Sequence, residues 1–466
     1  MKKFRHVHFV GIKGVAMTAL AIVAKEQGSY VTGSDIEEEF PTSAVLSKFK
    51  ITPLPGFKKE NIVGKPDLVV VTGAHGGMSN PEAQAAKSAG LKVLMHGQAL
   101  GEFMKGKKGI AVAGSHGKTT CAAMVAHILI NAGLDPSFAV GCGEIKSLTA
   151  PGHAGRGNYF VVEADEYVTD PGQDPTPRFF HLSPLVAVIT NIEYDHPDAY
   201  SNLEQLKQAF LTFAKKIPSD GLLVAGIDNE NVRAILSSLK SPILTFGFSP
   251  RADFQISRVS FGRGRTWFRI KHKKIDLGQF SLSIPGRHNA TNAVAASIVS
   301  SFLGISWEKI RQNLATFLGT KRRFEEVGER EGIKFFDDYA HHPTEIKATL
   351  EAARAWFPRR KIVCIFQPHT FSRTKALMGE FSKCFTQASQ VIITDIYPSA
   401  REKPEEEINS KILVNEIQKY HKNAIYIGKM EEAANFVGNQ ANPGTVILTM
   451  GAGDIYKIHK YFLSQI

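Results

Sequence analysis

The feature that most constrains this chain is the segment at residues 109–120, which reads Gly-Ile-Ala-Val-Ala-Gly-Ser-His-Gly-Lys-Thr-Thr. A short apolar run leads into a glycine-rich turn, and a lysine and two hydroxyl side chains follow. This order predicts a buried strand, a phosphate-binding turn and a helix from Thr119 to Asn131, whose positive N-terminal end faces the phosphates. The segment therefore predicts a site for a nucleoside triphosphate.

Each residue type in the turn has a physical reason. Gly114 and Gly117 let backbone N–H groups approach phosphate oxygens, and Lys118 places a cation against the β and γ phosphates. Thr119 offers a hydroxyl to Mg²⁺. A strict P-loop has a glycine where this chain has Val112, so the turn is a shortened variant, and a glycine turn with a solvated lysine is the plainer alternative. The predicted ATP-binding turn comprises Gly114, Ser115, His116, Gly117, Lys118, Thr119 and Thr120.

Composition is typical of an ordinary soluble globular protein. The chain has 466 residues, more than one hydrophobic core usually holds, and typical domain sizes predict about three domains. Hydrophobic residues make up 43% and charged residues 21%, which excludes disordered and fibrous classes. The sequence has no run near the roughly 18 apolar residues of a membrane helix, so we expect no membrane insertion. The N-terminal apolar run is short and enters a glycine turn, which predicts a first strand instead of a secretion signal.

The spacing of the cysteines and the net charge limit which cellular environment and which kinds of ligand suit this chain. The four cysteines are widely spaced, which indicates neither a disulfide framework nor a zinc site and is typical of a reducing cytoplasm. The net charge of +12 suits ligands that carry phosphates and carboxylates. Because the lysines and arginines are spread out, without a dense basic run among aromatics, we expect no nucleic-acid partner. The sequence leaves a monomer and a homodimer both open.

The first hundred residues alternate strand-like and helix-like runs. We predict a helix at 15–27 and strands at 6–10, 30–33, 68–72 and 93–95. This rhythm is typical of a parallel α/β sheet, in which ligands collect at the C-terminal strand ends. Gly11 and Gly14 follow the first strand, and Asp35 closes the second. A dinucleotide fingerprint needs glycines where this chain has Lys13 and Ala16, so the sequence matches an NAD site poorly.

Two further α/β blocks follow. In the second, the predicted strands at 159–163 and 185–190 end in Glu163-Ala164-Asp165-Glu166 and in Asn191 to His196. Carboxylates and an imidazole at strand ends are typical of metal ligands and substrate contacts. The stretch between these strands, 169–177, is rich in Pro, Asp and Gly and predicts a loop.

The third block shows predicted strands at 334–336, 361–366, 390–394, 424–427 and 445–449. Four of them run into polar sequences, which lie at 337–343, 367–369, 395–398 and 451–454. Four such endings on one sheet edge predict the rim of a cleft. We divide the chain into three predicted domains, at 1–106, 107–315 and 316–466.

Eight motifs in this order resemble the Mur ligases, the ATP-dependent family that adds amino acids to the muropeptide precursor of the bacterial cell wall. The motifs are Gly11-Ile12 to Met17, Gly33-Ser34-Asp35, residues 114–120, Glu163 to Glu166, Thr190 to Glu193, His288-Asn289, Asp337 to Glu345, and Phe366 to His369. One alone is modest evidence, whereas eight in order leave little room for coincidence. The resemblance implies a three-domain α/β architecture, with a Rossmann-like N-terminal domain that binds the UDP-sugar, a central P-loop ATPase-like domain, and a Rossmann-like C-terminal domain that binds the amino acid.

The resemblance also implies a reaction. The motifs are most similar to the branch that joins L-alanine to the lactyl carboxylate of UDP-N-acetylmuramate in peptidoglycan precursor synthesis. ATP transfers its γ-phosphoryl group to that carboxylate, and the free amine then attacks the acyl phosphate. The nearest rival is the recycling ligase that adds a tripeptide: residues 366–374 favour the single-amino-acid branch, but Tyr167 is shared with the rival. The sequence does not separate alanine from glycine or serine.

The resemblance assigns roles around the phosphates and the metal. Lys118 neutralises phosphate, Thr119 and Glu163 hold the Mg²⁺ that bridges the β and γ groups, and His196 serves a second Mg²⁺. Further expected ATP contacts are Asn191, His288, Asn289, Arg323 and Asp338. The expected catalytic set is Lys118, Glu163, His196, His342 and Arg373.

Other roles concern the amino acid and the nucleotide sugar. His342 and Tyr339 are the candidates near the attacking amine, and Arg373 reaches an anionic substrate group, because a planar guanidinium suits a carboxylate or phosphate. The last domain is expected to swing about residues 316–323. The expected nucleotide-sugar contacts are Gly11, Gly14, Asp35, His75 and Asn80.

Each assignment has a plainer alternative. Glu163 suits a solvated strand end, His196 a loop, and His342 the border of a helix that starts with a proline. Arg323 lies in a run of charges that suits solvated surface. A dehydrogenase is disfavoured by the missing glycines, and a non-catalytic relative is expected to have lost Lys118, Glu163 or His196, all of which are present.

Overall fold

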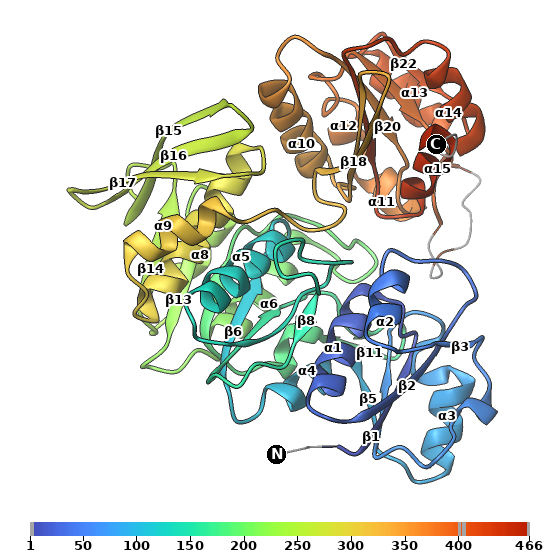
Figure 1. Ribbon diagram of the computed structural model, residues 1–466, viewed down its shortest axis with the longest axis vertical. Coiled ribbons are helices and arrows are strands. Elements are labelled where there is room, and N and C mark those ends of the chain that lie inside the picture. Colours follow the sequence, from blue (N-terminus) through green and yellow to red (C-terminus); the bar gives the residue numbers. More distant parts are fainter. Residues whose placement is uncertain (1–3, 399–401, 403–406, 464–466) are drawn as a thin grey trace.

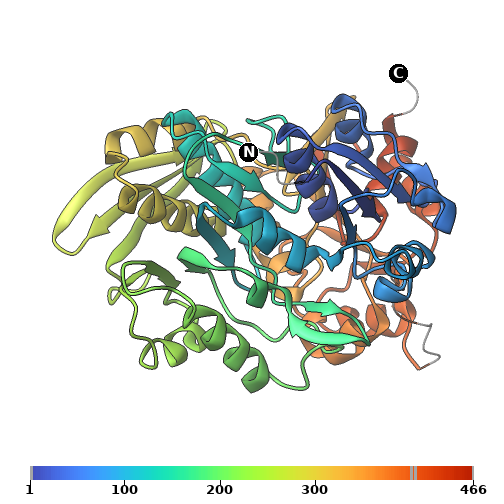
Figure 2. The same cartoon turned by 90° about the horizontal axis from the view of Figure 1, so that it is seen from below.

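The computed structural model describes residues 4–398, 402 and 407–463 (Figures 1 and 2). Three large sheets follow one another along the chain, each covered by helices, and they correspond to the blue, cyan-to-yellow and orange-to-red parts of Figure 1; a fourth sheet has only two strands. Within the described ranges, no helix is both long enough and apolar enough to cross a membrane.

The first sheet is wholly parallel, with strand order β3-β2-β1-β4-β5. Its central strand β1 is fully buried because helices cover both faces, as is typical of parallel sheets. The four predicted strands are present, and β3 is an additional short strand. The elements are β1 (His6–Val10), α1 (Val15–Glu26), β2 (Tyr30–Asp35), α2 (Ser43–Lys48), β3 (Leu54–Pro55), η1 (Lys59–Asn61), β4 (Leu68–Val71), η2 (Gly77–Ser79), α3 (Pro81–Ser88), β5 (Val93–Met95) and α4 (His96–Met104).

The central sheet has ten strands, in the order β17-β16-β15-β14-β13-β12-β6-β9-β7-β8. Alternate residues of β6 face two different cores: Ile110 and Val112 pack in the core that includes α5 and α8, whereas Ala111 and Ala113 pack in a core shared with the first domain. The elements up to β12 are β6 (Lys108–Ala113), α5 (Lys118–Asn131), β7 (Ser137–Ala139), β8 (Gly152–His153), β9 (Tyr159–Glu163), β10 (Val168–Asp170), β11 (Asp174–Pro177), η3 (Arg178–His181) and β12 (Pro184–Ile189).

The strands at the β17 end of this sheet were not predicted from the sequence. Beyond β14 the sheet continues through β15, β16 and β17, which pair antiparallel and form the yellow-green extension at the left of Figure 1. The remaining central elements are α6 (Leu203–Ala214), β13 (Leu222–Gly226), α7 (Glu230–Leu236), β14 (Ile243–Gly247), β15 (Phe254–Gly262), β16 (Arg265–His272), β17 (Ile275–Leu282), α8 (Arg287–Phe302) and α9 (Trp307–Ala315).

The prediction of a loop over 169–177 is wrong. β10 and β11 pair antiparallel and form a short hairpin, and Gly172 turns its tip with φ 77°. The breaker residues mark the tip correctly, but the arms are held by contacts that lie far away in sequence. One of these is the backbone N–H of Met78, which donates to the carboxylate of Asp170 at 2.9 Å.

The third sheet has the order β18-β19-β23-β20-β21-β22. β19, β23, β20 and β21 are parallel neighbours, so the four polar endings lie on one edge, as predicted. β19 extends further than predicted and includes Asp337 and Asp338. The elements are β18 (Glu325–Arg330), β19 (Ile333–Asp338), α10 (Pro343–Trp356), β20 (Lys361–Phe366), α11 (Phe371–Ala376), α12 (Met378–Phe381), β21 (Gln390–Ile393), α13 (Ser410–Gln418), β22 (Ala424–Tyr426), α14 (Met430–Gly438), β23 (Thr445–Met450), η4 (Ile455–Ile458) and α15 (His459–Leu463).

Each of the three domains contacts both of the others. His153 of the central domain pairs with Glu26 of the first domain at 2.7 Å. The guanidinium of Arg373, in the third domain, lies 2.9 Å from the carboxylate of Asp195 in the central domain. Lys457 of the third domain pairs with Glu38 of the first at 3.0 Å. The site described next lies where the central and third domains meet.

Candidate functional site

The glycine-rich turn joins β6 to α5 with backbone angles that side chains rarely tolerate. Gly114 has φ 134°, and a Cβ there would lie 2.0 Å from the hydroxyl oxygen of Thr190. Gly117 has φ 84° and caps α5 at its N-terminus. Only glycine fits at Gly114 without displacing Thr190.

Lys118 is folded back over the turn. Its ammonium group donates to the carbonyl of Gly114 at 2.6 Å and to both carboxylate oxygens of Glu166, at 3.0 and 2.9 Å. Burial lowers the pKa of Lys118, but the charges of Glu166 and Asp165 outweigh it, so the pKa lies above its ordinary value. Lys118 is therefore a buried cation that already points at the turn.

Thr119 and Glu163 come together as the sequence motif implied. The Thr119 hydroxyl donates to Glu163 Oε2 at 3.1 Å, and the Gly141 N–H donates to Glu163 Oε1 at 2.5 Å. Burial raises the pKa of Glu163, against the charge of Lys118. The Glu163 carboxylate is held at the end of β9, so it is not a freely solvated strand end.

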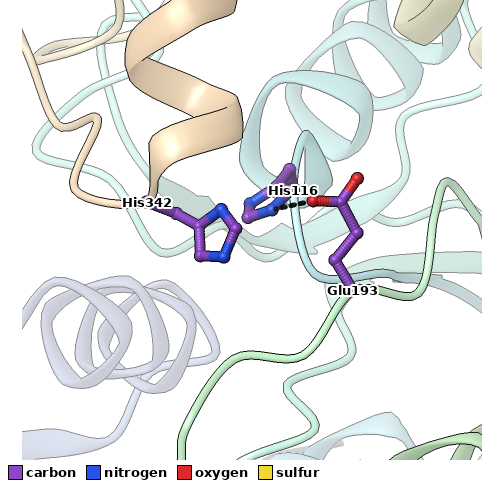
Figure 3. Close-up of side chains that lie close together, drawn as sticks. All are labelled: His116, Glu193 and His342. Carbon is purple, nitrogen blue, oxygen red and sulfur yellow. Dashed lines mark ion pairs between the residues drawn. The ribbon is translucent and has the colours of Figure 1, made fainter. Parts of the chain in front are cut away.

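His116 links the turn to the third domain. Its Nε2 lies 3.3 Å from Glu193 Oε2 and its Nδ1 lies 3.3 Å from Glu345 Oε1. Burial opposes protonation of the ring, but the two carboxylates overcome it and raise the pKa of His116 to about 10. The ring of His342 packs against that of His116 with centroids 4.6 Å apart. Figure 3 shows how His116, Glu193 and His342 converge from three separate segments.

His342 is the N-cap of α10, with Pro343 in the first helical position. The Thr344 N–H donates to His342 Nδ1 at 3.3 Å, and burial lowers the pKa of the ring. The plainer alternative, a residue at the border of a helix, thus describes its backbone role. Its side chain nevertheless faces the phosphate turn.

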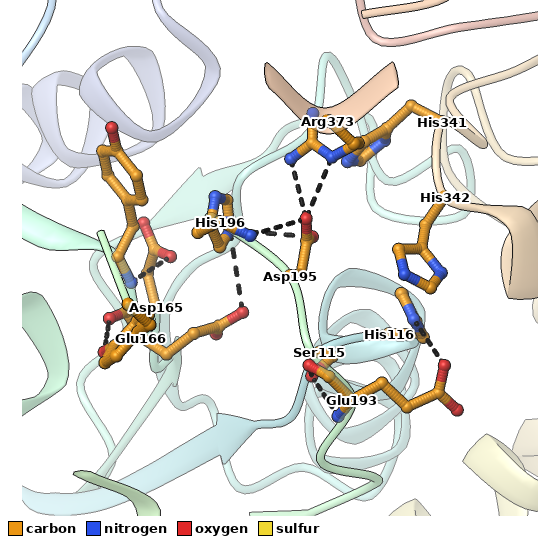
Figure 4. A network of polar contacts seen from close by, with 12 residues as sticks. Ser115, His116, Asp165, Glu166, Glu193, Asp195, His196, His341, His342 and Arg373 are labelled. Atoms are coloured by element: carbon orange, nitrogen blue, oxygen red, sulfur yellow. Dashed lines mark hydrogen bonds and ion pairs between the residues drawn. The ribbon is translucent and has the colours of Figure 1, made fainter. Parts of the chain in front are cut away.

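Asp195 and Arg373 form a buried ion pair between the central and third domains (Figure 4). The guanidinium Nε and Nη2 each lie 2.9 Å from Asp195 Oδ1. His196 follows with φ 61°, and its Nε2 lies 3.8 Å from Asp195 Oδ2 and 3.9 Å from Glu166 Oε1. Arg373 was expected to meet a substrate anion, but here the carboxylate of Asp195 already accepts its N–H donors.

Several predicted ATP contacts have partners within the protein. Asn191 accepts the backbone N–H of His116 at 2.8 Å and donates to its carbonyl at 3.0 Å, so its amide holds the turn in shape. Asn289 donates to the Pro285 carbonyl at 2.6 Å in the first turn of α8. Burial lowers the pKa of the neighbouring His288 to about 4, so that ring is neutral near pH 7.

Arg323, Asp338 and Tyr339 lie together at the start of the third domain. The guanidinium of Arg323 lies 5.2 Å from the centre of the Tyr339 ring and 3.6 Å from Glu345. Burial raises the pKa of Asp338 to about 6, although the carboxylate accepts the N–H groups of Phe324 and Ala340. Arg323 therefore lies at the domain boundary and is engaged with the third domain.

The predicted nucleotide-sugar residues form a second group, at the C-terminal edge of the first sheet. Gly11 has φ 80°, and a Cβ there would lie 2.5 Å from the Thr72 methyl carbon. The Asp35 carboxylate accepts the backbone N–H of Lys13 at 2.7 Å and lies 4.0 Å from the ring of His75. Asn80 caps α3 and donates to the His75 carbonyl at 3.0 Å, which fixes the loop before that helix.

Gly14 and Lys13 lie on the turn between β1 and α1. Gly14 is the N-cap of α1, where backbone N–H groups point toward the strand ends. The ammonium group of Lys13, which stands where a dinucleotide fingerprint has a glycine, donates to the carbonyls of Ile36 and Glu38 at 2.6 and 2.8 Å. In this structure Lys13 therefore holds the loop after β2.

Four acidic residues of the site were absent from the predicted set: Glu166, Glu193, Asp195 and Glu345. All four lie in polar segments that the sequence shows, after β9, after β12 and in the first turn of α10. The signal that would have found Glu166 is charge balance, because a buried lysine needs a counter-charge. Neither Glu193 nor Glu345 could be paired with His116 from sequence, since Glu193 follows a different strand of the central sheet and Glu345 reaches the ring from the third domain.

Comparison with known proteins gives the family. Three family models match the chain in order: "Mur ligase family, catalytic domain" over residues 6–108, "Mur ligase middle domain" over 112–300, and "Mur ligase, glutamate ligase domain" over 322–453. The chain belongs to the Mur ligase family. The resemblance inferred from the eight motifs is thereby confirmed.

Individual Mur ligases match over nearly the whole chain. The UDP-N-acetylmuramate–L-alanine ligase of Desulfitobacterium hafniense strain Y51 is 41% identical, covering 97% of this chain and 98% of the relative. The enzyme of the same name from Caldanaerobacter subterraneus subsp. tengcongensis is 40% identical, covering 100% and 98%. The crystal structure of the UDP-N-acetylmuramate–alanine ligase of Thermotoga maritima has a TM-score of 0.82 at 29% identity, covering 98% of each chain. A murein peptide ligase from Psychrobacter arcticus gives 0.74 at 26%, covering 99% and 98%.

Proposed function

We propose that this Mur ligase joins L-alanine to the lactyl carboxylate of UDP-N-acetylmuramate, using ATP and passing through an acyl phosphate. The observation that carries the proposal is identity of about 40% over the full length with relatives named for this reaction. The arrangement of Lys118, Thr119 and Glu163 around the glycine turn supports the ATP-dependent step. The proposal places the reaction in the cytoplasm, where ATP is available, as a step of peptidoglycan precursor synthesis.

We assign the first step to the phosphate turn. Lys118 exchanges its bonds to the turn carbonyls for phosphate oxygens, while Glu166 keeps the ammonium group charged and in place. Because the lysine is already beside the turn, little reorganisation accompanies ATP binding. The transfer itself requires positioning of the carboxylate in line with the γ-phosphoryl group.

The Thr119 hydroxyl and the Glu163 carboxylate fit a magnesium ion. Both are hard oxygen donors, and they lie 3.1 Å apart at the phosphate turn. When bound, Mg²⁺ neutralises charge on the transferring phosphoryl group. His196 is the proposed ligand of a second ion, and Asp195 and Glu166 lie 3.8 and 3.9 Å from its Nε2.

The amine step is assigned to the third domain. The alanine amine must lose a proton before it attacks, and burial keeps the ring of His342 neutral and able to accept one. Arg373 reaches a substrate carboxylate or phosphate by sharing its N–H donors with Asp195 or by leaving that partner. Tyr339 and His342 flank this region on the loop and helix start that follow β19.

An omission experiment tests the proposal. Purified protein is supplied with ATP, Mg²⁺, UDP-N-acetylmuramate and L-alanine, and phosphate release is measured with each component left out in turn. We expect steady release only with the complete mixture. Absence of turnover with any amino acid, in a protein shown to be folded, would overturn the ligase assignment.

The same assay separates the amine substrates. With the nucleotide sugar fixed, L-alanine competes against glycine, L-serine and the tripeptide of the recycling reaction, and the products are resolved by mass. We expect the alanyl product to predominate. Preference for the tripeptide would favour the rival branch of the family, while leaving the ATP-dependent chemistry intact.

A further inference from the structure

We propose that His116, Glu193 and His342 form a binding site for a transition-metal ion of the Zn²⁺ class, separate from the magnesium site of the proposed reaction. One ligand atom from each of the three side chains lies within 4.8 Å of the others (Figure 3). His116 and Glu193 belong to the central domain and His342 to the third. A metal ion bound here joins the phosphate turn to the N-terminus of α10, and it occupies the lone pair with which His342 would otherwise accept a proton in the amine step.

The first independent observation is an unsatisfied nitrogen. His342 is 5% exposed, and its Nε2 is buried without a hydrogen-bond partner. The other ring nitrogen, Nδ1, accepts only the 3.3 Å contact from the Thr344 N–H. A buried polar atom with no partner is costly, and coordination to a metal satisfies it at the expense of that one long contact.

The second observation is the environment of His116. Its Nε2 faces Glu193 at 3.3 Å and is also buried without a hydrogen bond, while its Nδ1 faces Glu345 at 3.3 Å. Histidines that bind metals usually donate their second N–H to a carboxylate, which orients the ring. Glu345 is placed for that role. The ion pair explains why His116 lies beside Glu193, but it does not explain the unpartnered nitrogen of His342.

The donor set selects the class of metal. Two imidazole nitrogens and one carboxylate oxygen suit Zn²⁺, Co²⁺ or Ni²⁺, whereas Mg²⁺ favours sites in which most ligands are oxygens. Three protein ligands leave a fourth position for water. Binding releases the proton that His116 carries between its two carboxylates.

Cobalt titration tests this site in the nucleotide-free protein. The full chain is treated with a chelator, desalted and titrated with Co²⁺, whose visible absorption is strong only in four-coordinate sites. We expect a saturable band at one ion per chain, which Zn²⁺ abolishes. Absence of such a band, or binding without a defined stoichiometry, would overturn the proposal.

Matched variants assign the ligands. His342→Asn removes the imidazole but keeps a residue that caps helices well, and we expect at least about tenfold weaker binding of Co²⁺. Glu193→Gln should have a similar effect, whereas Glu204→Gln, an exposed residue on α6, and Glu163→Gln, at the magnesium site, should leave the band unchanged. An unchanged titration in His342→Asn, or loss of the band in Glu163→Gln, would contradict the assignment. Thermal unfolding of each variant checks that it is folded.

Discussion

Lys118 is held at the phosphate turn before any nucleotide binds, because Glu166 supplies the counter-charge that a buried ammonium group requires. The lysine also donates to the Gly114 carbonyl, so its direction is fixed from two sides. A pre-placed cation stabilises negative charge that develops during phosphoryl transfer without reorganising first. Glu166, which touches the protein's own lysine, is in this view a positioning residue.

Lys118→Ala should lower turnover by at least about a hundredfold, because losing one charge-stabilising contact of this kind costs roughly 3 kcal/mol. Phosphate release under saturating substrates measures the effect. The variant leaves Glu166 buried without its cation, so its thermal unfolding must be recorded beside the rate. A folded Lys118→Ala protein with the wild-type rate would remove Lys118 from the mechanism.

For individual residues, the sequence predicted which side chains belong to the phosphate site better than it predicted which residues contact one another. The motif placed Thr119 with Glu163, and the structure brings them to 3.1 Å. It did not indicate that Asn191 would hold the backbone of the turn, because an amide beside a phosphate site suits the ligand and the protein equally. The pairing of His116 with Glu345 joins two domains, and no local pattern encodes a contact of that kind.

At the scale of secondary-structure elements, the contact between α1 and β8 includes an ion pair whose contribution to stability depends on pH. His153 on β8 lies 2.7 Å from Glu26 on α1 and 3.1 Å from Asp135. The hydrogen bond to Glu26, with that to Asp135, raises the pKa of His153 above 6.5 despite partial burial. A raised pKa in the folded state means that the pair stabilises fully below pH 6.5, and that this stability is lost as the pH rises through the folded-state value.

The free energy of unfolding should therefore fall more steeply above pH 6.5 in the wild type than in His153→Gln. Urea titrations at several pH values between about 5.5 and 8.5 measure the difference, and Glu26 stays ionised throughout that range because its pKa is lowered from 4.5. Parallel curves for the two proteins would show that His153 does not titrate with folding.

Elements differ in how far sequence predicts them. The buried strands β1, β6 and β20 were found because continuous apolar runs between turn residues are distinctive. The antiparallel strands β15 and β16 alternate more and less buried side chains, but register shifts interrupt both ladders, and β17 does not alternate, which obscures the strand pattern in the sequence. The hairpin β10–β11 is stabilised by contacts with residues that are distant in sequence, such as Met78. Its own Pro- and Asp-rich sequence does not contain that information and shows only the pattern of a loop.

At the scale of the whole molecule, the ion pair of Asp195 and Arg373 holds the third domain against the central one. Asp195→Asn removes the carboxylate that both guanidinium contacts use and leaves the buried Arg373 only the weaker attraction of Asp198 and Glu345, which is unfavourable. We expect the ligand-free variant to populate a more open arrangement about residues 316–323, with a larger radius of gyration in small-angle scattering. Asp220→Asn, at an exposed position of the central domain, is the matched control. Equal radii for the two variants would count against this role.

Because Glu38 pairs with Lys457, the three domains contact one another in a closed ring and not in a row. In a row, either end could swing out alone. In a closed ring, moving one domain away strains or breaks its contacts with both of the others. Ligand access to the space between the domains therefore depends on all three domains together. A change at the rim where the outermost lobes meet should thus be felt at the phosphate turn, although it touches none of the reacting atoms.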